Sequence, residues 1–163
     1  MKKICLICAS ILLTFNPNCF SNEFEELKAL AEQGDPVAQY ELYKMYYFGQ
    51  GVTKDDMLSL EWLLKSVQSG FPVAQCELGR IYCYDGKNQN YNKAIAWLQA
   101  AAKQGYARAQ YELYKMYYSG KGVSQNYALA FKWLQAAAEQ EYAEAQSEFY
   151  KMTSENAEYH NAD

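Results

Sequence analysis

Apolar residues recur every three or four positions along most of the chain, the spacing that gathers them on one face of a helix. Between residues 36 and 48, for example, Ala38, Leu42 and Met45 share a face. Polar or glycine-containing segments interrupt the pattern at regular intervals. It therefore predicts an all-α protein with eight helices, over residues 22–33, 36–48, 55–69, 72–84, 91–104, 107–119, 126–140 and 143–152.

The helical pattern repeats as a unit of 35 or 36 residues. The nine residues at 39–47 return unchanged at 110–118, and a divergent copy lies between them at 75–83. The tryptophans follow the same spacing, at Trp62, Trp97 and Trp133. Because whole segments recur at a fixed interval, the sequence is that of a repeat protein.

Each unit consists of two predicted helices joined by short turns. Asp35 is a suitable cap residue, and Pro36 after it occupies the first helical turn, where proline is tolerated. Gly34, Gly70 and Gly105 stand where a left-handed residue closes the preceding helix, and such short turns make neighbouring helices antiparallel. One hairpin cannot bury both sides of its core, so the units must stack. We therefore expect an α-solenoid of antiparallel helix hairpins.

These residues resemble the Sel-1-like repeat, a relative of the tetratricopeptide repeat. The positions that carry the resemblance are Ala38, Leu42, Tyr46, Gly49, Gly51 and Val52, and again Ala109, Leu113, Tyr117, Gly120, Gly122 and Val123. The leucine-glycine pair of that family is kept only at Leu78 and Gly79, with Tyr43 and Tyr114 replacing the glycine elsewhere. The resemblance implies about three and a half repeats in a right-handed superhelix, whose concave surface binds partners and is lined by the first helix of each unit.

The N-terminal residues differ in kind from the repeats. Lys2 and Lys3 precede an apolar run over residues 4–15, which is the order of a secretory signal. This run is shorter than the roughly 20 residues that cross a bilayer. We expect a signal peptide over 1–21 with cleavage near Ser21, a repeat domain over 22–152, and a frayed tail over 153–163. The protein would then act in the bacterial periplasm or outside the cell; the alternative is an uncut membrane anchor.

Charge and cysteine content narrow the choice of partners. Beyond residue 21 the chain has 13 basic and 19 acidic residues, a balance that disfavours general nucleic-acid binding. Only Cys76 and Cys83 remain there, two helical turns apart. Their Cα atoms would lie about 10.5 Å from each other, beyond the roughly 7 Å limit for a disulfide. We expect them to pack against neighbouring units or to pair between molecules, and not with each other.

A helical wheel separates two groups of side chains on the first helix of each unit. Ala38, Leu42, Met45 and Tyr46 form the expected core side, and Leu78 belongs to the same side in the central unit. We predict that Leu78→Ala costs about 2–5 kcal/mol of stability. The opposite side predicts a partner-binding groove with aromatic walls, small residues between them and a basic ladder. Its residues are Tyr40, Tyr43, Lys44, Tyr47, Gly79, Arg80, Tyr111, Tyr114, Lys115, Tyr118, Tyr150 and Lys151, with Cys76 and Cys83 among the small ones.

Two simpler interpretations of this second side remain open. Tyrosines at helical spacing also fill the space between stacked units, in which case they belong to the scaffold. Each basic residue follows a glutamate by three positions, and such pairs stabilise an exposed helix by roughly 0.2–0.5 kcal/mol. The four pairs are Glu41–Lys44, Glu77–Arg80, Glu112–Lys115 and Glu148–Lys151.

The sequence offers little for catalysis. His160 is the single histidine, and no histidine or cysteine cluster has the spacing of a metal site. We therefore expect no enzyme and no cofactor, but a non-catalytic module that binds another protein or peptide, without nucleic acid and without a membrane span after signal removal. Proteins similar to this one act as adaptors, regulators or immunity proteins. The alternative is a β-lactam-binding or slowly hydrolysing enzyme, as described for cysteine-rich relatives, although those carry bridged cysteines in successive repeats.

Overall fold

The computed structural model describes the backbone of residues 17–86 and 89–160, and side chains within 23–86 and 89–154. Eight α-helices make up these residues, and no strand occurs among them. The helices are α1 (Pro17–Glu32), α2 (Pro36–Phe48), α3 (Asp56–Gln68), α4 (Pro72–Tyr84), α5 (Tyr91–Lys103), α6 (Ala107–Ser119), α7 (Tyr127–Glu139) and α8 (Ala143–His160).

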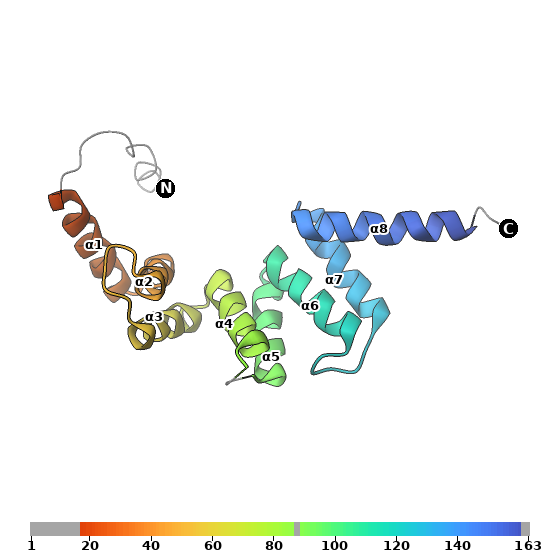
Figure 1. Cartoon of the computed structure of the whole chain (residues 1–163), viewed down its shortest axis with the longest axis horizontal. Coiled ribbons are helices and arrows are strands. Elements are labelled where there is room, and N and C mark those ends of the chain that lie inside the picture. Colours follow the sequence, from red (N-terminus) through yellow and green to blue (C-terminus); the bar gives the residue numbers. More distant parts are fainter. Residues whose placement is uncertain (1–16, 87–88, 161–163) are drawn as a thin grey trace.

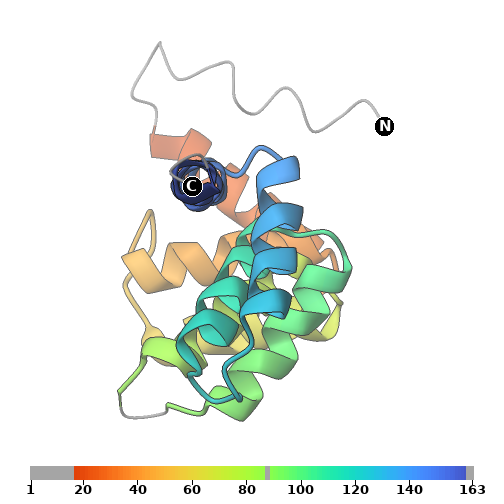
Figure 2. The same ribbon diagram turned by 90° about the vertical axis from the view of Figure 1, so that its right-hand side faces the viewer.

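The helices form an array of stacked hairpins that bends into an arc (Figure 1). The pairs α2–α3, α4–α5 and α6–α7 are the three complete hairpins, with α1 before them and α8 after them. In Figure 1, α2, α4 and α6 lie toward the inner side of the arc, and α3, α5 and α7 toward its outer side. Figure 2 looks along the array with α8 nearly end-on, and the successive hairpins lie behind one another. The predicted α-solenoid is confirmed.

Local sequence signals explain where the helices begin and end. The Asp35 carboxylate accepts hydrogen bonds from the backbone N–H groups of Val37 and Ala38, at 2.9 and 2.8 Å. Asn90 and Asn126 accept equivalent bonds at the starts of α5 and α7. Side-chain oxygens of this kind satisfy N–H groups that have no partner within the helix. The predicted boundaries of the six helices between 36 and 140 agree with the structure to within one residue.

The two terminal helices are longer than predicted. Helix α1 begins at Pro17, within the expected signal segment, and residues 1–16 of that segment lie outside the described residues. Helix α8 continues past Met152 to His160, eight residues beyond its predicted end. That stretch contains neither glycine nor proline, and the Thr153 hydroxyl donates to the Phe149 carbonyl within the helix. Nothing in it interrupts the helical backbone.

Leucine and alanine side chains form the core between the helices. Each of the helices from α2 to α7 except α4 contributes one fully buried leucine: Leu42, Leu63, Leu98, Leu113 and Leu134. Leu78 fills the corresponding place in α4 and is only 3% exposed, so its predicted core position is confirmed. Fully buried alanines, such as those at 94, 101, 130 and 137, let the helices of a pair approach closely.

A ladder of glutamine side chains, absent from the sequence predictions, links the ends of the outer helices. The Gln39 amide donates to the Ala31 carbonyl at 3.1 Å, and its oxygen accepts from the Ser69 hydroxyl at 3.2 Å. Gln110 repeats this arrangement, donating to the Ala102 carbonyl and accepting from the Gln140 amide at 2.8 Å. The amide nitrogen of each of these two glutamines thus donates to a carbonyl at the end of one helix, and its oxygen accepts a hydrogen bond from a residue that follows the next outer helix. Buried polar groups need such partners. We call Gln39, Gln75, Gln110 and Gln146 the glutamine ladder.

One turn of the array departs from the pattern of the others. Gly34, Gly70 and Gly105 adopt left-handed backbone angles, with φ of 95°, 81° and 83°, as predicted. The equivalent turn before α8 places Glu141 at φ 61°. A residue with a Cβ atom is strained there because the Cβ approaches the following carbonyl oxygen.

Replacing Glu141 with glycine is therefore expected to stabilise the protein by about 1 kcal/mol. Urea unfolding followed by circular dichroism measures this change. Glu141→Ala is the matched control, because it removes the same carboxylate but keeps the strained Cβ atom. An equal gain in both variants would assign the effect to charge and not to backbone strain.

Candidate interaction surface

The predicted groove residues do not form one continuous exposed face. Tyr43 and Tyr114 are buried, with 6% and 4% of their surface exposed, so the prediction that they point away from the core is wrong. The Tyr114 hydroxyl donates to the Glu148 carboxylate of α8 at 3.3 Å. Burial raises the pKa of both phenols above its usual range, with a further contribution from Glu77 beside Tyr43 and Glu148 beside Tyr114. These two rings hold adjacent units together.

Tyr40 and Tyr111 lie between core and surface. Each is half-buried and packs against an aromatic residue in the turn before the next inner helix. The ring centroids are 5.8 Å apart for Tyr40 and Phe71, and 5.5 Å apart for Tyr111 and Tyr142. Burial raises the pKa of Tyr40 to about 12. Most of the surface of these two rings is therefore used in packing between units, as the simpler interpretation of the tyrosines predicted.

Exposed aromatic side chains gather instead where the inner helices end. Tyr47 and Tyr118 are 46% and 45% exposed. The Tyr47 ring lies 4.9 Å from that of Phe48, and the Tyr118 ring lies 5.4 Å from that of Tyr127. We call these exposed residues the aromatic rim: Tyr47, Phe48, Tyr84, Tyr118 and Tyr127. Tyr150, the last predicted tyrosine of the groove, is exposed on α8 but forms no part of the rim.

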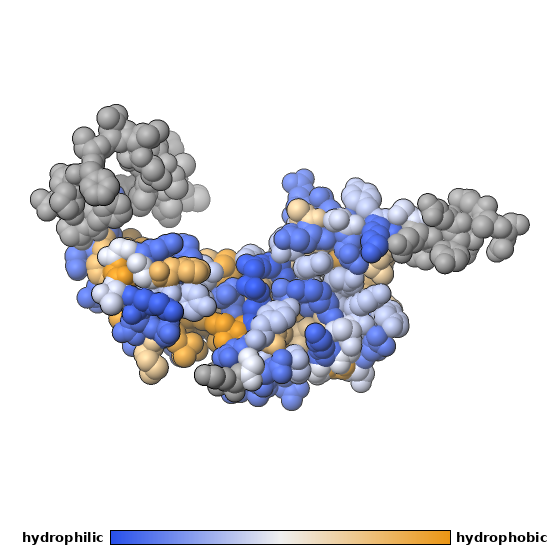
Figure 3. All heavy atoms as spheres, in the orientation of Figure 1, coloured by the Kyte–Doolittle hydropathy of each residue, from blue (hydrophilic) through white to orange (hydrophobic). Residues whose placement is uncertain are grey.

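The basic ladder consists mainly of ion-paired side chains. Lys44, Arg80 and Lys115 lie 2.7, 3.0 and 2.6 Å from the glutamate three residues before each of them. Lys151 is exposed, and Glu148 before it accepts the hydrogen bond from Tyr114. The pairing interpretation is therefore confirmed for the first three units. In the view of Figure 3, hydrophilic residues cover much of the surface, and hydrophobic patches lie mainly toward the N-terminal hairpins.

Glu112 has a role that the sequence analysis did not identify. It is only 6% exposed, and its carboxylate contacts Lys115 of α6 at 2.6 Å, the Tyr84 hydroxyl at 2.9 Å and Arg80 Nε at 3.6 Å. Burial by itself lowers the pKa of Lys115, but the Glu112 carboxylate and the Tyr84 hydroxyl outweigh it and raise that pKa. The carboxylate thus connects α4 to α6.

We expect Glu112→Gln to lower the free energy of unfolding by about 2–3 kcal/mol, because a neutral amide replaces the buried carboxylate that balances Lys115 and Arg80, and its NH2 group faces other donors. Glu41→Gln removes the same charge at the same spacing from its lysine, but the Glu41 side chain is 42% exposed. That control is expected to change stability by less than about 0.5 kcal/mol. Equal changes in the two variants, measured by urea unfolding, would contradict the bridging role of Glu112.

The small residues of the central unit do not line an open groove. Cys76, Gly79 and Cys83 are all buried. A Cβ atom on Gly79 would lie 2.8 Å from Leu98 Cγ, so the missing side chain makes room for α5. Cys83 Sγ lies 3.7 Å from Met116 Sδ in the next unit. The two thiols are not bonded to each other, and both are buried inside the array, which is the packing alternative of the prediction.

The two thiols should react slowly in the folded protein. Burial raises the pKa of Cys76 to about 12 and that of Cys83 to about 11, and the thiolate is the reactive form. At pH 8 we expect a disulfide reagent to label both residues slowly in the native protein and rapidly in guanidinium, as measured by peptide mass spectrometry. Immediate native labelling would contradict this burial.

The same shifts give a pH dependence of stability. Below the unfolded thiol pKa of about 9 both states are protonated, so the contribution of these groups is fully present. As the pH rises from about 9 toward 11–12, the unfolded state loses its protons first and stability falls. The free energy of unfolding, measured in urea at pH 8 and at pH 10.5, should be lower at pH 10.5.

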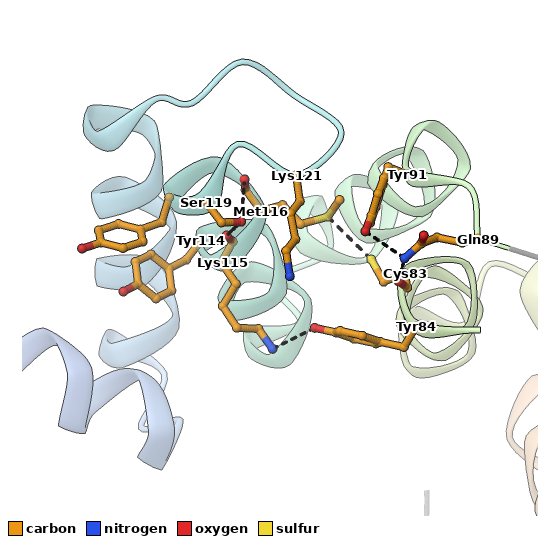
Figure 4. Close-up of a pocket in the computed structure, with 10 residues that line it drawn as sticks. Cys83, Tyr84, Gln89, Tyr91, Tyr114, Lys115, Met116, Ser119 and Lys121 are labelled. Carbon is orange, nitrogen blue, oxygen red and sulfur yellow. Dashed lines mark hydrogen bonds between the residues drawn. The ribbon is translucent and has the colours of Figure 1, made fainter. Parts of the chain in front are cut away.

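A cavity of about 390 Å³ lies between the C-terminal ends of α4 and α6. In Figure 4, Cys83, Tyr84 and Tyr91 lie on one side of this space and Lys115 and Met116 on the other, with Lys121 extending between them and the Tyr114 ring turned away. Its volume is within the range of roughly 300–1,000 Å³ that is usual for ligand pockets. We call this the inter-unit pocket.

Within the described residues, no group of three or more histidine, cysteine, aspartate or glutamate side chains is arranged to hold a metal ion. No described helix is long and apolar enough to cross a membrane. The inter-unit pocket is lined by aromatic, sulfur-containing, amide, hydroxyl and ammonium groups. Such groups bind side chains of a partner by stacking, hydrogen bonding and charge.

Comparisons with known proteins agree with the repeat architecture. The family model of the Sel1 repeat matches residues 36–71, 72–106 and 107–142. Among characterised proteins, the chain is 32% identical over 104 residues to "ERAD-associated E3 ubiquitin-protein ligase component HRD3B" of Arabidopsis thaliana. That match covers 62% of this chain but 16% of the relative, so the chain spans about a sixth of the plant protein.

Two crystal structures share the fold. A Sel1 repeat protein from Oxalobacter formigenes has a TM-score of 0.75 and 33% identity, covering 80% of this chain and 98% of that one. The protective antigen c5321 of uropathogenic Escherichia coli has a TM-score of 0.71 and 30% identity, covering 83% of this chain and 32% of that one. Three consecutive family matches and a structure covered almost end to end show that this chain belongs to the Sel1 repeat family.

Proposed function

We propose that this protein is a non-catalytic interaction module that holds a partner protein against the edge of the array where the inner helices end. Sel1 repeat proteins are protein-interaction modules. The observation that carries the proposal is the aromatic rim, whose five side chains are 45–62% exposed. Exposed aromatic side chains in a soluble protein mark binding surfaces, since they bury large areas with little loss of side-chain entropy.

The proposed binding surface is smaller than the groove predicted from sequence. It keeps Tyr47 and Tyr118 and adds Phe48, Tyr84 and Tyr127, whereas Tyr43 and Tyr114 belong to the scaffold. Lys44 and Lys115 contribute through the part of each side chain that remains exposed, 36% and 38% respectively. This set could serve an adaptor, a regulator or an immunity-type protein equally well.

We also propose that the protein acts in the periplasm or outside the cell. The support is the order of charges and apolar residues at the N-terminus, with Lys2 and Lys3 before the apolar run over 4–15. Fractionation of cells that produce the full chain checks this, with Lys2→Glu/Lys3→Glu as the variant that disturbs the signal. Recovery of the unmodified chain in the cytoplasmic fraction at full length would refute export.

Site-specific photocrosslinking tests the binding surface. A benzophenone side chain placed at position 48 or 127 should capture the same partner from an envelope extract, because both positions belong to the aromatic rim. A benzophenone at Lys132, which is exposed on α7, is the matched control and should capture far less. Equal capture from all three positions would contradict a binding surface at the rim.

A further inference from the structure

The inter-unit pocket lies where the central unit lacks a side chain that its neighbours have. Position 83 is cysteine, whereas the equivalent residues of the first and third units are Tyr47 and Tyr118. In those units the tyrosine ring lies against the ring four residues earlier, with centroids 5.7 Å apart for Tyr43 and Tyr47. The central unit has Gly79 at that earlier position, and Leu98 fills its space. The space beside Cys83 remains as the pocket.

Hydrogen bonds within the protein hold the walls of the pocket in place. The Gln89 amide donates to the Tyr91 hydroxyl at 2.8 Å and to the Cys83 carbonyl at 2.9 Å. Lys115 Nζ donates to the Tyr84 hydroxyl at 3.2 Å. Gly122 packs so closely against Tyr91 that no Cβ atom fits between them. A site with walls fixed in this way loses little entropy when it binds.

The charge of the pocket is positive. Of the described residues that line it, Lys115 and Lys121 are charged and none is acidic. Glu112 lies beside the pocket, where it pairs with Lys115 at 2.6 Å and with Arg80 at 3.6 Å. Lys121 makes no ion pair with any described residue. Figure 4 shows the Lys115 and Lys121 side chains extending toward the same space, next to the Tyr84 ring.

We propose that the inter-unit pocket binds an aromatic side chain of a partner protein, in a segment where acidic residues flank that side chain. The aromatic ring would take the place beside Cys83 that tyrosine occupies in the other units, next to the Tyr84 ring. The flanking carboxylates would pair with Lys121 and Lys115. Tyrosine rings can also bind a cationic side chain. Lys115 and Lys121 would repel such a side chain from this pocket. This inference rests on the proposed function and specifies the chemistry of its partner.

Synthetic peptides test the pocket without the natural partner. The probe is acetyl-Gly-Asp-Phe-Asp-Gly-amide with 4-fluorophenylalanine as its aromatic residue, titrated with the full chain and followed by fluorine NMR. We expect binding with a Kd of about 1 mM or tighter, as one anchored side chain and two surface ion pairs provide. Replacing both aspartates with asparagine should weaken binding at least about threefold, and replacing them with lysine should abolish it. Replacing the aromatic residue with alanine should also abolish binding, measured by competition.

Two variants of the protein locate the binding site. Cys83→Tyr restores the residue found in the other units and fills the pocket. It should therefore raise the Kd of the acidic aromatic peptide more than about tenfold. Lys121→Glu changes only an exposed side chain, and it should reverse the preference from the acidic to the basic peptide. Lys132→Glu, an equivalent change on exposed α7, is the control and should leave binding unchanged. Melting temperatures of all three show whether they are folded.

The outcomes separate this inference from the proposed function. If neither Cys83→Tyr nor Lys121→Glu changes peptide binding, or if acidic, neutral and basic peptides bind equally, the inference is overturned. Should Cys83→Tyr fail to fold, the Lys121→Glu result alone decides. The crosslinking positions 48 and 127 do not line the pocket. Partner capture there with no peptide binding would leave the proposed function standing and remove this inference.

Discussion

Replacing Tyr114 with alanine is expected to lower the free energy of unfolding by about 3–5 kcal/mol, the usual cost of removing a buried aromatic ring. Tyr114 is 4% exposed and packs with Ala130, Leu134 and Ala137 in one cluster. Its hydroxyl also donates to Glu148 across the interface to α8. Urea unfolding followed by circular dichroism measures the change, at a pH well below the raised pKa of the phenol.

Tyr150 provides the matched control for this experiment. It occupies the same position of the repeat as Tyr114, but in α8, the last described helix, where it is 69% exposed. Tyr150→Ala is therefore expected to change stability by less than about 0.5 kcal/mol. If both variants lost the same stability, burial between units could not be the cause, and the ring of Tyr114 would have to be assigned to a role within its own helix.

Replacing Leu78 with alanine is expected to cost about 2–5 kcal/mol. Leu78 is 3% exposed and lies in the cluster that joins the first and second units, which includes Leu42, Leu63 and Trp62. Stability in a repeat array comes largely from interfaces between neighbours, so a cavity in the central unit weakens both halves. The unfolding midpoint in urea should fall accordingly.

Leu60→Ala is the control for that prediction. It removes the same side chain from α3, where Leu60 is 42% exposed, and should cost much less. An unfolding midpoint that is unchanged by Leu78→Ala would show that the cluster does not contribute to stability as its burial indicates. A broader transition for Leu78→Ala than for Leu60→Ala would indicate that the two halves of the array unfold separately.

The helices and their order were predictable because local signals and the repeat agree with one another. Asp35 caps α2 as expected, and glycines at positions 34, 70 and 105 adopt the left-handed angles that short turns require. Because the units recur at a fixed interval, a helix boundary found in one unit predicts the equivalent boundary in the next. The start of α1 and the end of α8 have no equivalent boundary in another unit, so they could not be predicted in this way. Those are the two places where the predicted helix lengths were wrong.

The groove prediction was wrong for Tyr43 and Tyr114, because a helical wheel does not describe a helix that packs against several neighbours. The wheel assumes one buried side per helix, which holds for a helix that covers a core from outside. In a stacked array, an inner helix contacts its own outer helix and also the inner helices beside it. Tyr43 and Tyr114 are therefore buried in clusters that include residues of their own outer helix and of the next inner helix. Tyr47 and Tyr118 were predicted correctly because they stand at the ends of the inner helices, where 46% and 45% of their surface stays exposed.

The buried polar groups were missed for a related reason. Glutamine and glutamate are usually exposed, so composition alone assigns Gln110 and Glu112 to the surface. Their partners are far apart in sequence: Gln110 accepts from Gln140, and Glu112 accepts from Tyr84. The signal available was the recurrence of glutamine at 39, 75, 110 and 146.

The glutamine ladder also gives the array a direction in which it can be lengthened. The amide nitrogens of Gln39, Gln110 and Gln146 donate to the end of the helix before them. The amide oxygens of Gln39, Gln75 and Gln110 accept from a residue 29 or 30 positions later. Two copies of the chain joined tail to tail would oppose like groups, whereas a further hairpin added after α8 would meet the free side of the Gln146 amide correctly. An engineer who extends this protein should therefore append units at its carboxyl end, with a donor side chain thirty residues after Gln146.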